Sequence, residues 1–392
     1  YIDQSFNEGM INSAEERKNV LNLAKTLGYN TKASVPAFVE LTLSQTMNAV
    51  GDSTGKLPDY GESLVLDKGL RVQSTSDSDV FFETLDVCDF SITGSNELGP
   101  QPLTVDSNGF VETYKVDKKV LAISGKTKTM SFNIQSPKEF LKLELPDLDV
   151  ISIENVRDSN NNIWYQVDYL AQDRVFTETR RADPYSGTNV PVTFDLNPDI
   201  TTQKRFIVEV NDENKTSLIF GNGVIKSSAG DNYVEDVFYG EQEVNSIIAG
   251  TLPSTLDPAG SLTYKSLGEA PSNTTITIEY RVGGGIKSNL PSADLTTVVN
   301  KNLLNTPSSD AEDSAETIMG SLSVTNEFPS RGGADKETIT EIREKAKAFF
   351  TTQNRCVTKE DYESRIKSLP ARFGSIAKVY VTRKTSENPT AL

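Results

Sequence analysis

Apolar residues near the start of the chain recur every three or four positions and then every second position. The first pattern predicts a helix over 13–27, with Ser13 and Glu16 as a capping box and Gly28 after the last turn. Its apolar face carries Val20, Leu23, Ala24 and Leu27. The second pattern begins near Val35 and predicts a half-buried strand over 35–43. The chain therefore changes from helix to sheet near residue 34.

Short alternating runs of apolar and polar residues continue to about residue 282, separated by clusters of Gly, Asn, Asp and Pro. This arrangement is typical of antiparallel strands packed as a sandwich or barrel. Besides 35–43, the predicted strands are 64–72, 80–90, 111–123, 140–145, 151–156, 164–167, 206–210, 217–220 and 275–282.

The last quarter of the chain returns to a helical pattern. A connector rich in Ser, Asp, Thr and Asn comes first, with short helices expected over 293–304 and 311–319. Two amphipathic helices follow, over 337–350 with Asp335 as the cap, and over 359–369 with a capping box from Thr358 to Asp361. Ile376, Val379 and Val381 then predict a closing strand.

These elements together predict an α+β, mainly β fold with several domains. We expect a helical segment over 1–33 and a first β-rich domain over 34–150. A second β-rich domain follows over 151–290, with a long insert at about 224–273. The connector then spans 291–335, and the C-terminal helix pair and strand span 336–392. Because the first residue is Tyr1, we expect the sequence to be part of a longer protein.

Charge and residue usage narrow the function classes. The chain has 39 basic and 55 acidic residues, a formal net charge of −16, which opposes binding to nucleic acid and to anionic membrane surfaces. It contains no histidine, the commonest general base and metal ligand. Cys88 and Cys356 are its only cysteines and have no zinc-site spacing. We therefore expect no metal, no cofactor and no small-molecule substrate.

Several candidate sites have simpler interpretations. Asp158, Asn160 and Asn162 are spaced like calcium ligands, but Ile163 stands where glycine is required, which favours a β-turn between Val156 and Trp164. The glycines at 283–285 lack the surrounding pattern of a phosphate loop, and a strand end that needs positive φ explains them.

Glu235 and Asp236 could serve as glycosidase carboxylates, although abundant acidic residues usually form a solvated surface. Trp164 and the tyrosines could form a sugar platform, but their spread over alternating strands favours core positions.

The C-terminal helices carry motifs that resemble the baseplate J-like family of contractile phage tails. The family has a Val-Thr-Asn turn, a Gly-Gly-Ala-Asp helix start and an Arg-x-Val-Thr-x-x-Asp-Tyr second helix. The matching residues here are Val324, Thr325 and Asn326, then Gly332, Gly333, Ala334, Asp335 and Glu337, then Arg355, Val357, Thr358, Asp361 and Tyr362.

A second landmark of that family is a Phe-Gly-Asp-Gly turn followed by a strand that ends Tyr-Arg-x-Gly-Gly-Gly and an Asn-containing turn. This sequence is similar in Phe220, Gly221, Asn222 and Gly223, then in Tyr280, Arg281, Gly283, Gly284, Gly285 and Asn289. It departs from the pattern at Asn222, where Asp is usual, and in the long insert between the two pieces. The length of the insert favours the wedge subunit of large contractile-tailed phages.

The resemblance implies a structural role without catalysis. A wedge protein associates with copies of itself and with other wedge and hub subunits, and six wedges close a ring around the tail hub. Its expected location is the tail baseplate of the virion, after assembly in the host cytoplasm. Two other function classes stay open: a carbohydrate-binding tail or adhesin module, and a peptidoglycan-cleaving tail enzyme.

The N-terminal helix face is a candidate interface. A terminal helix has fewer neighbours in its own chain to cover it, and the apolar residues concerned are Val20, Leu23 and Leu27.

Overall fold

The computed structural model describes residues 6–32, 34–52, 55–92, 99–107, 109–172, 174–180, 194–223, 267–307, 315–353 and 355–382. Three hydrophobic cores divide this part of the chain into three modules. The helical module comprises residues 6–32 and 336–382. The first β module comprises 34–124 and 286–330, and the second β module comprises 126–282. The second β module is thus inserted into the first, and the first is inserted into the helical module.

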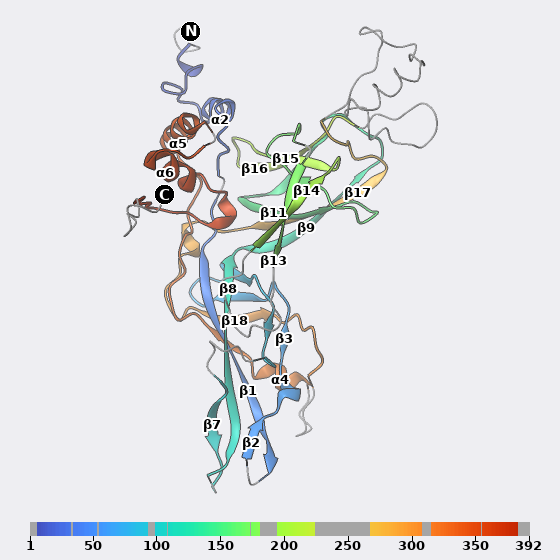
Figure 1. Ribbon diagram of the computed structural model, residues 1–392, viewed down its shortest axis with the longest axis vertical. Helices are drawn as coiled ribbons and strands as arrows, with labels where there is room; N and C mark the ends of the chain where they lie inside the picture. Colours follow the sequence, from blue (N-terminus) through green and yellow to red (C-terminus); the bar gives the residue numbers. More distant parts are fainter. Residues whose placement is uncertain are drawn as a thin grey trace, which may run out of the picture.

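The first β module forms the lower half of Figure 1 and is built on one antiparallel sheet. The sheet order is β18 (Leu295–Asn300), β4 (Arg71–Ser74), β5 (Phe81–Thr84), β8 (Val111–Ser124), β1 (Phe38–Asp52) and β19 (Ser323–Thr325), with β2 (Gly55–Pro58) paired to β1 and β7 (Gln101–Val105) paired to β8. The module also contains the pair β3 (Val65–Leu66) and β6 (Cys88–Asp89), the 3-10 helix η1 (Tyr60–Glu62) and the helix α4 (Ala315–Gly320).

The second β module packs two sheets against each other. One has the order β10 (Lys142–Leu148), β16 (Lys215–Phe220), β15 (Arg205–Val210) and β12 (Tyr165–Gln166), and the other has β11 (Val150–Arg157), β17 (Thr274–Val282) and β9 (Lys126–Ile134). The core between them includes Trp164, Phe206, Phe220 and Ile276. A further pair, β13 (Arg174–Arg180) and β14 (Phe194–Thr201), belongs to the same stretch of chain.

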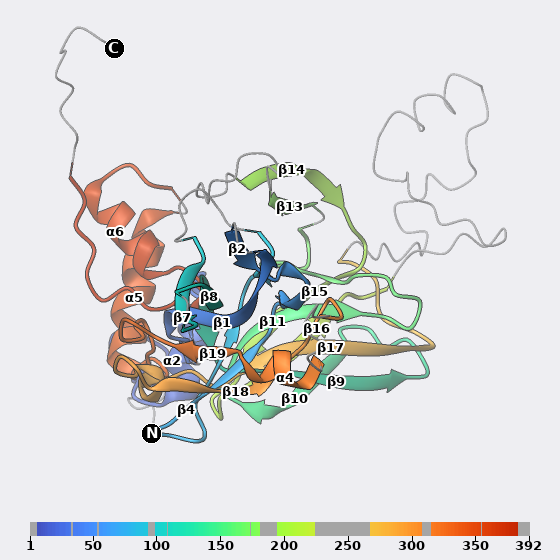
Figure 2. The same cartoon turned by 90° about the horizontal axis from the view of Figure 1, so that it is seen from below.

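The helical module joins the two ends of the described chain. The helices α2 (Arg17–Thr26) and α5 (Ile339–Thr352) share one core, and α6 (Lys359–Lys367) and the 3-10 helix η3 (Ala371–Phe373) follow α5. Figures 1 and 2 both show α2 beside α5. The remaining 3-10 helix, η2 (Ile286–Ser288), lies where the chain leaves β17.

The predicted α+β, mainly β class is confirmed. Strands β8, β11, β15, β16 and β17 agree with the alternating runs at their positions to within about two residues at each end. The runs over 64–72 and 80–90 each break into two short strands, because the chain turns between them. The domain boundary expected at 150/151 lies at the start of β11, whereas the core changes at Gly125, between β8 and β9.

Four predicted elements differ from the structure. Residues 293–304 do not form a helix but contain β18, whose run of Thr296, Thr297, Val298 and Val299 is β-branched and favours a strand. In the described part of 376–381 there is no strand. The first helix begins at Arg17, and Ser13 bonds the carbonyl of Asn7 instead of capping it. The cap of α5 is Thr338, in a capping box with Glu341, so the prediction that Asp335 caps this helix is wrong.

Candidate functional site: the junction of the three modules

Three stretches of chain meet where the modules join, and we call them the junction: Ser34–Phe38, Gly283–Leu290 and Ser330–Asp335. The predicted positive φ values are present at Gly283, Gly284 and Gly285, at +117°, +79° and +82°. A Cβ atom on Gly284 would lie 3.0 Å from the carbonyl oxygen of Val35. The glycines therefore allow the end of β17 to approach the backbone that enters β1.

Val35 is the centre of this backbone contact. Its N–H donates to the carbonyl of Ala334 (2.8 Å), and its own carbonyl accepts from the N–H groups of Ala334 (3.2 Å) and Gly285 (3.1 Å). Three residues further on, Phe38 and Arg331 exchange backbone hydrogen bonds of 2.7 and 2.9 Å. The segment that leads into β1 therefore contacts both landmark stretches of the sequence, Gly283–Asn289 and Gly332–Asp335.

Side chains reinforce the same contact. Asn289 donates to the carbonyl of Gly333 (2.8 Å) and accepts from its N–H (3.0 Å). Asp335 accepts from the N–H of Ile286 at 2.9 Å, three residues before Thr338, which caps α5. Ser330 accepts from the N–H of Leu290 and donates to the carbonyl of Ser288, both at 2.6 Å.

Asn326, from the Val-Thr-Asn stretch, organises the neighbouring turn. It is fully buried, and its Oδ1 accepts from the N–H groups of Asp294 and Leu295 at 3.0 and 2.9 Å. Its amide donates to the carbonyls of Pro291 and Phe328. All the donors and acceptors of this amide are used, so Asn326 fixes the path between η2 and β18.

The stretch Phe220–Gly223 lies elsewhere, inside the second β module. Phe220 is buried with its ring centroid 5.2 Å from that of Trp164, in an edge-on contact. A Cβ atom on Gly221 would lie 2.2 Å from the carbonyl oxygen of Gly268, so only glycine fits there. Asn222 accepts from the N–H of Leu267 at 3.1 Å, a role that the usual Asp would also perform. Most of the predicted insert, 224–266, lies outside the described residues.

The motif at the start of α6 is a helix cap. Thr358 and Asp361 form the predicted capping box, and Asp361 also accepts from the N–H of Val357 at 3.1 Å. Hydrogen bonds from the N–H groups of Thr358 and Val357 lower the pKa of the Asp361 carboxyl. The side chain of Arg355 donates to Gln353, and Val357 and Tyr362 are exposed. This motif therefore begins the helix and does not reach the junction.

The N-terminal helix face is covered by the chain itself. Val20 and Ala24 are fully buried against Ile342 and Ala346 of α5, and Leu23 and Leu27 are partly buried in the same cluster. The expectation that Val20 is free for an interface is therefore wrong, because α5 returns from the far end of the sequence to pack on it. Leu23 and Leu27 retain only part of their surface.

Polar contacts hold the same helices together. Tyr29 donates to the buried carboxylate of Glu337 at 2.6 Å, and Lys345 pairs with it at 2.7 Å. Burial, with the nearby Glu337, raises the pKa of the Tyr29 hydroxyl well above its usual value. Arg343 donates to the carbonyls of Ile11 and Ala14, both at 2.8 Å.

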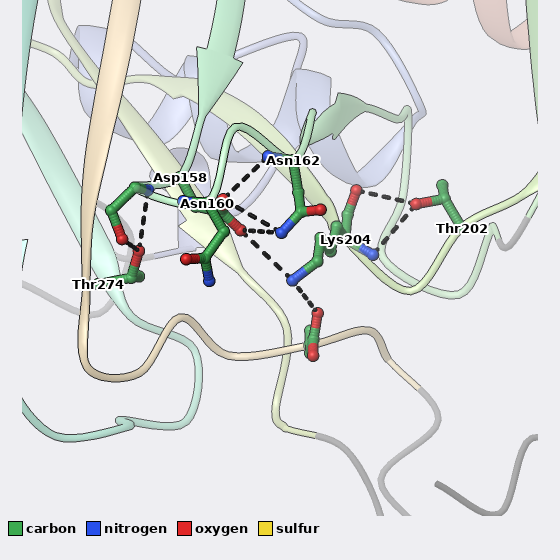
Figure 3. A network of polar contacts seen from close by, with 8 residues as sticks. Asp158, Asn160, Asn162, Thr202, Lys204 and Thr274 are labelled. Carbon is green, nitrogen blue, oxygen red and sulfur yellow. Dashed lines mark hydrogen bonds and ion pairs between the residues drawn. The ribbon is translucent and has the colours of Figure 1, made fainter.

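The Asp158–Asn162 stretch is a turn, as predicted. Asp158 accepts from the N–H groups of Asn160 and Asn162, both at 2.9 Å, and from the Asn162 amide (Figure 3). Lys204 lies 3.5 Å from the same carboxylate. Burial alone would raise the pKa of Asp158, but the bonds from Asn162 and the charge of Lys204 outweigh it and lower the pKa.

A cavity of about 270 Å³ lies beside this turn and has polar walls, lined by Asn155, Arg157, Asp158, Asn161, Thr277 and Glu279. The Asp158 carboxylate in its wall already accepts hydrogen bonds from Asn160 and Asn162 of the same turn.

Other candidate residues are placed as follows. Trp164 is 3% exposed, so the interpretation as a core residue is confirmed and a sugar platform on its ring is ruled out. Glu235 and Asp236 lie outside the described residues. Cys88 is buried and Cys356 is exposed, and the two are not joined by a disulfide bond. Within the described ranges no group of three or more Cys, Asp or Glu is placed to hold a metal ion, and no helix is long and apolar enough to cross a membrane.

The sequence reasoning missed one set of buried charges beside the junction. Glu83 on β5 is 2% exposed and Arg281 on β17 is 6% exposed, and they lie 3.4 Å apart. Nearly 200 residues separate them in the sequence, and no local pattern links them.

We compared the chain with known protein families and with curated proteins. Neither the models of protein families nor the curated proteins that we searched gave a match to this chain.

Proposed function

We propose that this chain is a structural subunit of a contractile-tail baseplate wedge. It associates with copies of itself and with other wedge and hub subunits, and it transmits the conformational change of tail contraction. It acts in the tail baseplate of the virion and assembles in the host cytoplasm. No catalytic role, cofactor, nucleic acid, membrane or small-molecule substrate is part of the proposal.

The observation that carries the proposal is the junction. Two of the residues there that resemble baseplate J-like proteins, Gly285 and Ala334, bond through backbone groups to the same residue, Val35. They connect three modules with separate cores. Such a connection passes force from one module to the next, which is what a baseplate subunit requires.

The surface charge supports association with oppositely charged partners. A net charge of −16 produces an electrostatic field that attracts basic neighbouring subunits to this chain and repels nucleic acid. Salt screens such a field, with a Debye length of about 8 Å at physiological ionic strength. We therefore expect complexes with other tail proteins to weaken as salt is raised.

The test is the light-scattering mass of the purified chain, alone and mixed with each neighbouring tail protein. We expect a defined homo-oligomer or a hetero-complex of fixed composition, and the hetero-complex should weaken between low and high salt. A globular protein of similar size and net charge serves as the control for non-specific attraction. A chain that stays monomeric and inert toward every tail protein would overturn the proposal.

A further inference from the structure

The chain passes between the two β modules twice, and a glycine lies at each of the two connections. Strand β8 of the first module continues into β9 of the second with only Gly125 between them, and β17 returns to the first module through Gly283. Both glycines have positive φ, at +116° and +117°. A Cβ atom on Gly283 would lie 3.1 Å from the Cα atom of Gly125. The two connections therefore cross the boundary at one point (Figure 1).

A buried carboxylate bridges this boundary. Glu83 belongs to the first β module, where Arg71 of the next strand donates to it at 2.8 Å. From the second module, Thr127 donates its N–H (3.0 Å) and its hydroxyl (2.6 Å) to the same carboxylate. Thr127 is two residues beyond Gly125 and is paired with Arg281 across β9 and β17. Glu83 thus contacts both connecting strands of the second module.

Arg281 of the second module also interacts with Glu83, through an ion pair and not through a hydrogen bond. Its Nη1 lies 3.4 Å from Glu83 and its Nε lies 3.6 Å from Glu154. Among the described residues, neither nitrogen has a hydrogen-bond partner, although both are buried. The guanidinium is therefore held by two carboxylates at distances that a small rotation of one module would change.

We propose that Gly125 and Gly283 form a hinge between the two β modules, and that Glu83 is the latch that holds it at the angle seen. The charge of Glu83 offsets that of Arg281 only while the modules keep this angle. Without that charge, rotation about the two glycines lets water reach the Arg281 guanidinium, so other angles become populated. The hinge is a property of this chain alone and does not depend on the proposed function.

The experiment measures the spread of angles in the whole chain. Spin labels are attached at two exposed positions, Thr129 on β9 and Thr297 on β18, through T129C and T297C in a C356S background. Pulsed dipolar spectroscopy then gives the distance distribution between the modules. We expect a narrow distribution with native Glu83 and one at least twice as wide in E83Q.

The matched control is Glu62→Gln. Glu62 is also 2% exposed, but the hydrogen bonds that its carboxylate accepts from Asn48 lie within the first β module. E62Q should therefore keep the narrow distribution even if it lowers the melting temperature. An E83Q distribution as narrow as the native one, or an E62Q distribution equally broadened, would overturn the latch.

A second variant covers the case in which E83Q does not fold. Arg281→Gln breaks the pair from the other side and leaves Glu83 with Arg71 and Thr127. We expect R281Q to broaden the distribution, and an unchanged width in R281Q would equally contradict the proposal. Circular dichroism of each variant confirms that the β modules are folded before the distances are compared.

Discussion

At the scale of single residues, Gly333 shows how tightly the junction is packed. A Cβ atom there would lie 2.5 Å from the carbonyl oxygen of Gly285 and 3.1 Å from Oδ1 of Asn289. We predict that Gly333→Ala lowers the free energy of unfolding by about 1–3 kcal/mol, because backbone must move to admit the methyl group. Gly320→Ala is the control, since nothing lies within 4 Å of its Cβ position, and it should change stability by less than about 0.5 kcal/mol. Urea denaturation distinguishes the two, and equal losses would contradict the packing argument.

Tyr29 gives a prediction for alkaline pH. Its pKa is raised in the folded chain by burial and by Glu337, whereas the pKa of a tyrosine in an unfolded chain is about 10. The folded chain keeps the proton while the unfolded chain releases it, so stability is lost as pH rises above about 10. Unfolding free energies measured at about pH 9 and pH 11 should therefore fall more steeply in the native chain than in Tyr29→Phe. Identical slopes would mean that Tyr29 is not protected as described.

At the scale of elements, α5 and α6 both begin with a threonine capping box but differ in how they are packed. Thr338 caps α5, which packs on α2, whereas Thr358 caps α6, which has no buried residue. Each cap is worth about 1 kcal/mol. We predict that Thr338→Ala lowers the melting temperature of the helical module, while Thr358→Ala only speeds amide exchange within α6. Hydrogen exchange with mass spectrometry separates these outcomes, and global destabilisation by Thr358→Ala would contradict this account of α6.

The elements that the sequence predicts well are those whose pattern is local. Strand β17 alternates cleanly, and the capping box of α6 is readable from Thr358 and Asp361. Strand β9 was not predicted, because its Lys-Thr-Lys-Thr start is polar and only its pairing with β17 makes it a strand. The bonds that join Val35 to Gly285 and to Ala334 connect residues 250 and 299 positions apart, so no window of the sequence contains them. The same holds for Glu83 and Arg281.

At the scale of the whole molecule, three separate cores predict three units of local unfolding. Ile342 and Leu218 are both fully buried aliphatic residues, the first in the helical module and the second in the second β module. Replacing either by Ala should cost about 2–5 kcal/mol within its own module. We predict that Ile342→Ala speeds amide exchange in α2 and α5 but not in β16, and that Leu218→Ala does the reverse. Faster exchange everywhere in both variants would show a single cooperative unit.

The nesting of the modules also dictates an order of events during synthesis on the ribosome. Helix α2 ends at Thr26 and its partner α5 begins at Ile339, which is 339 − 26 = 313 residues later. At roughly 5–20 residues per second, α2 waits on the order of 15–60 s before α5 is made. The innermost module can close as soon as β17 has left the exit tunnel, whereas Val20 and Ala24 stay uncovered until α5 has left it. A nascent chain of this protein is therefore in need of a chaperone at α2, long after that helix has left the ribosome.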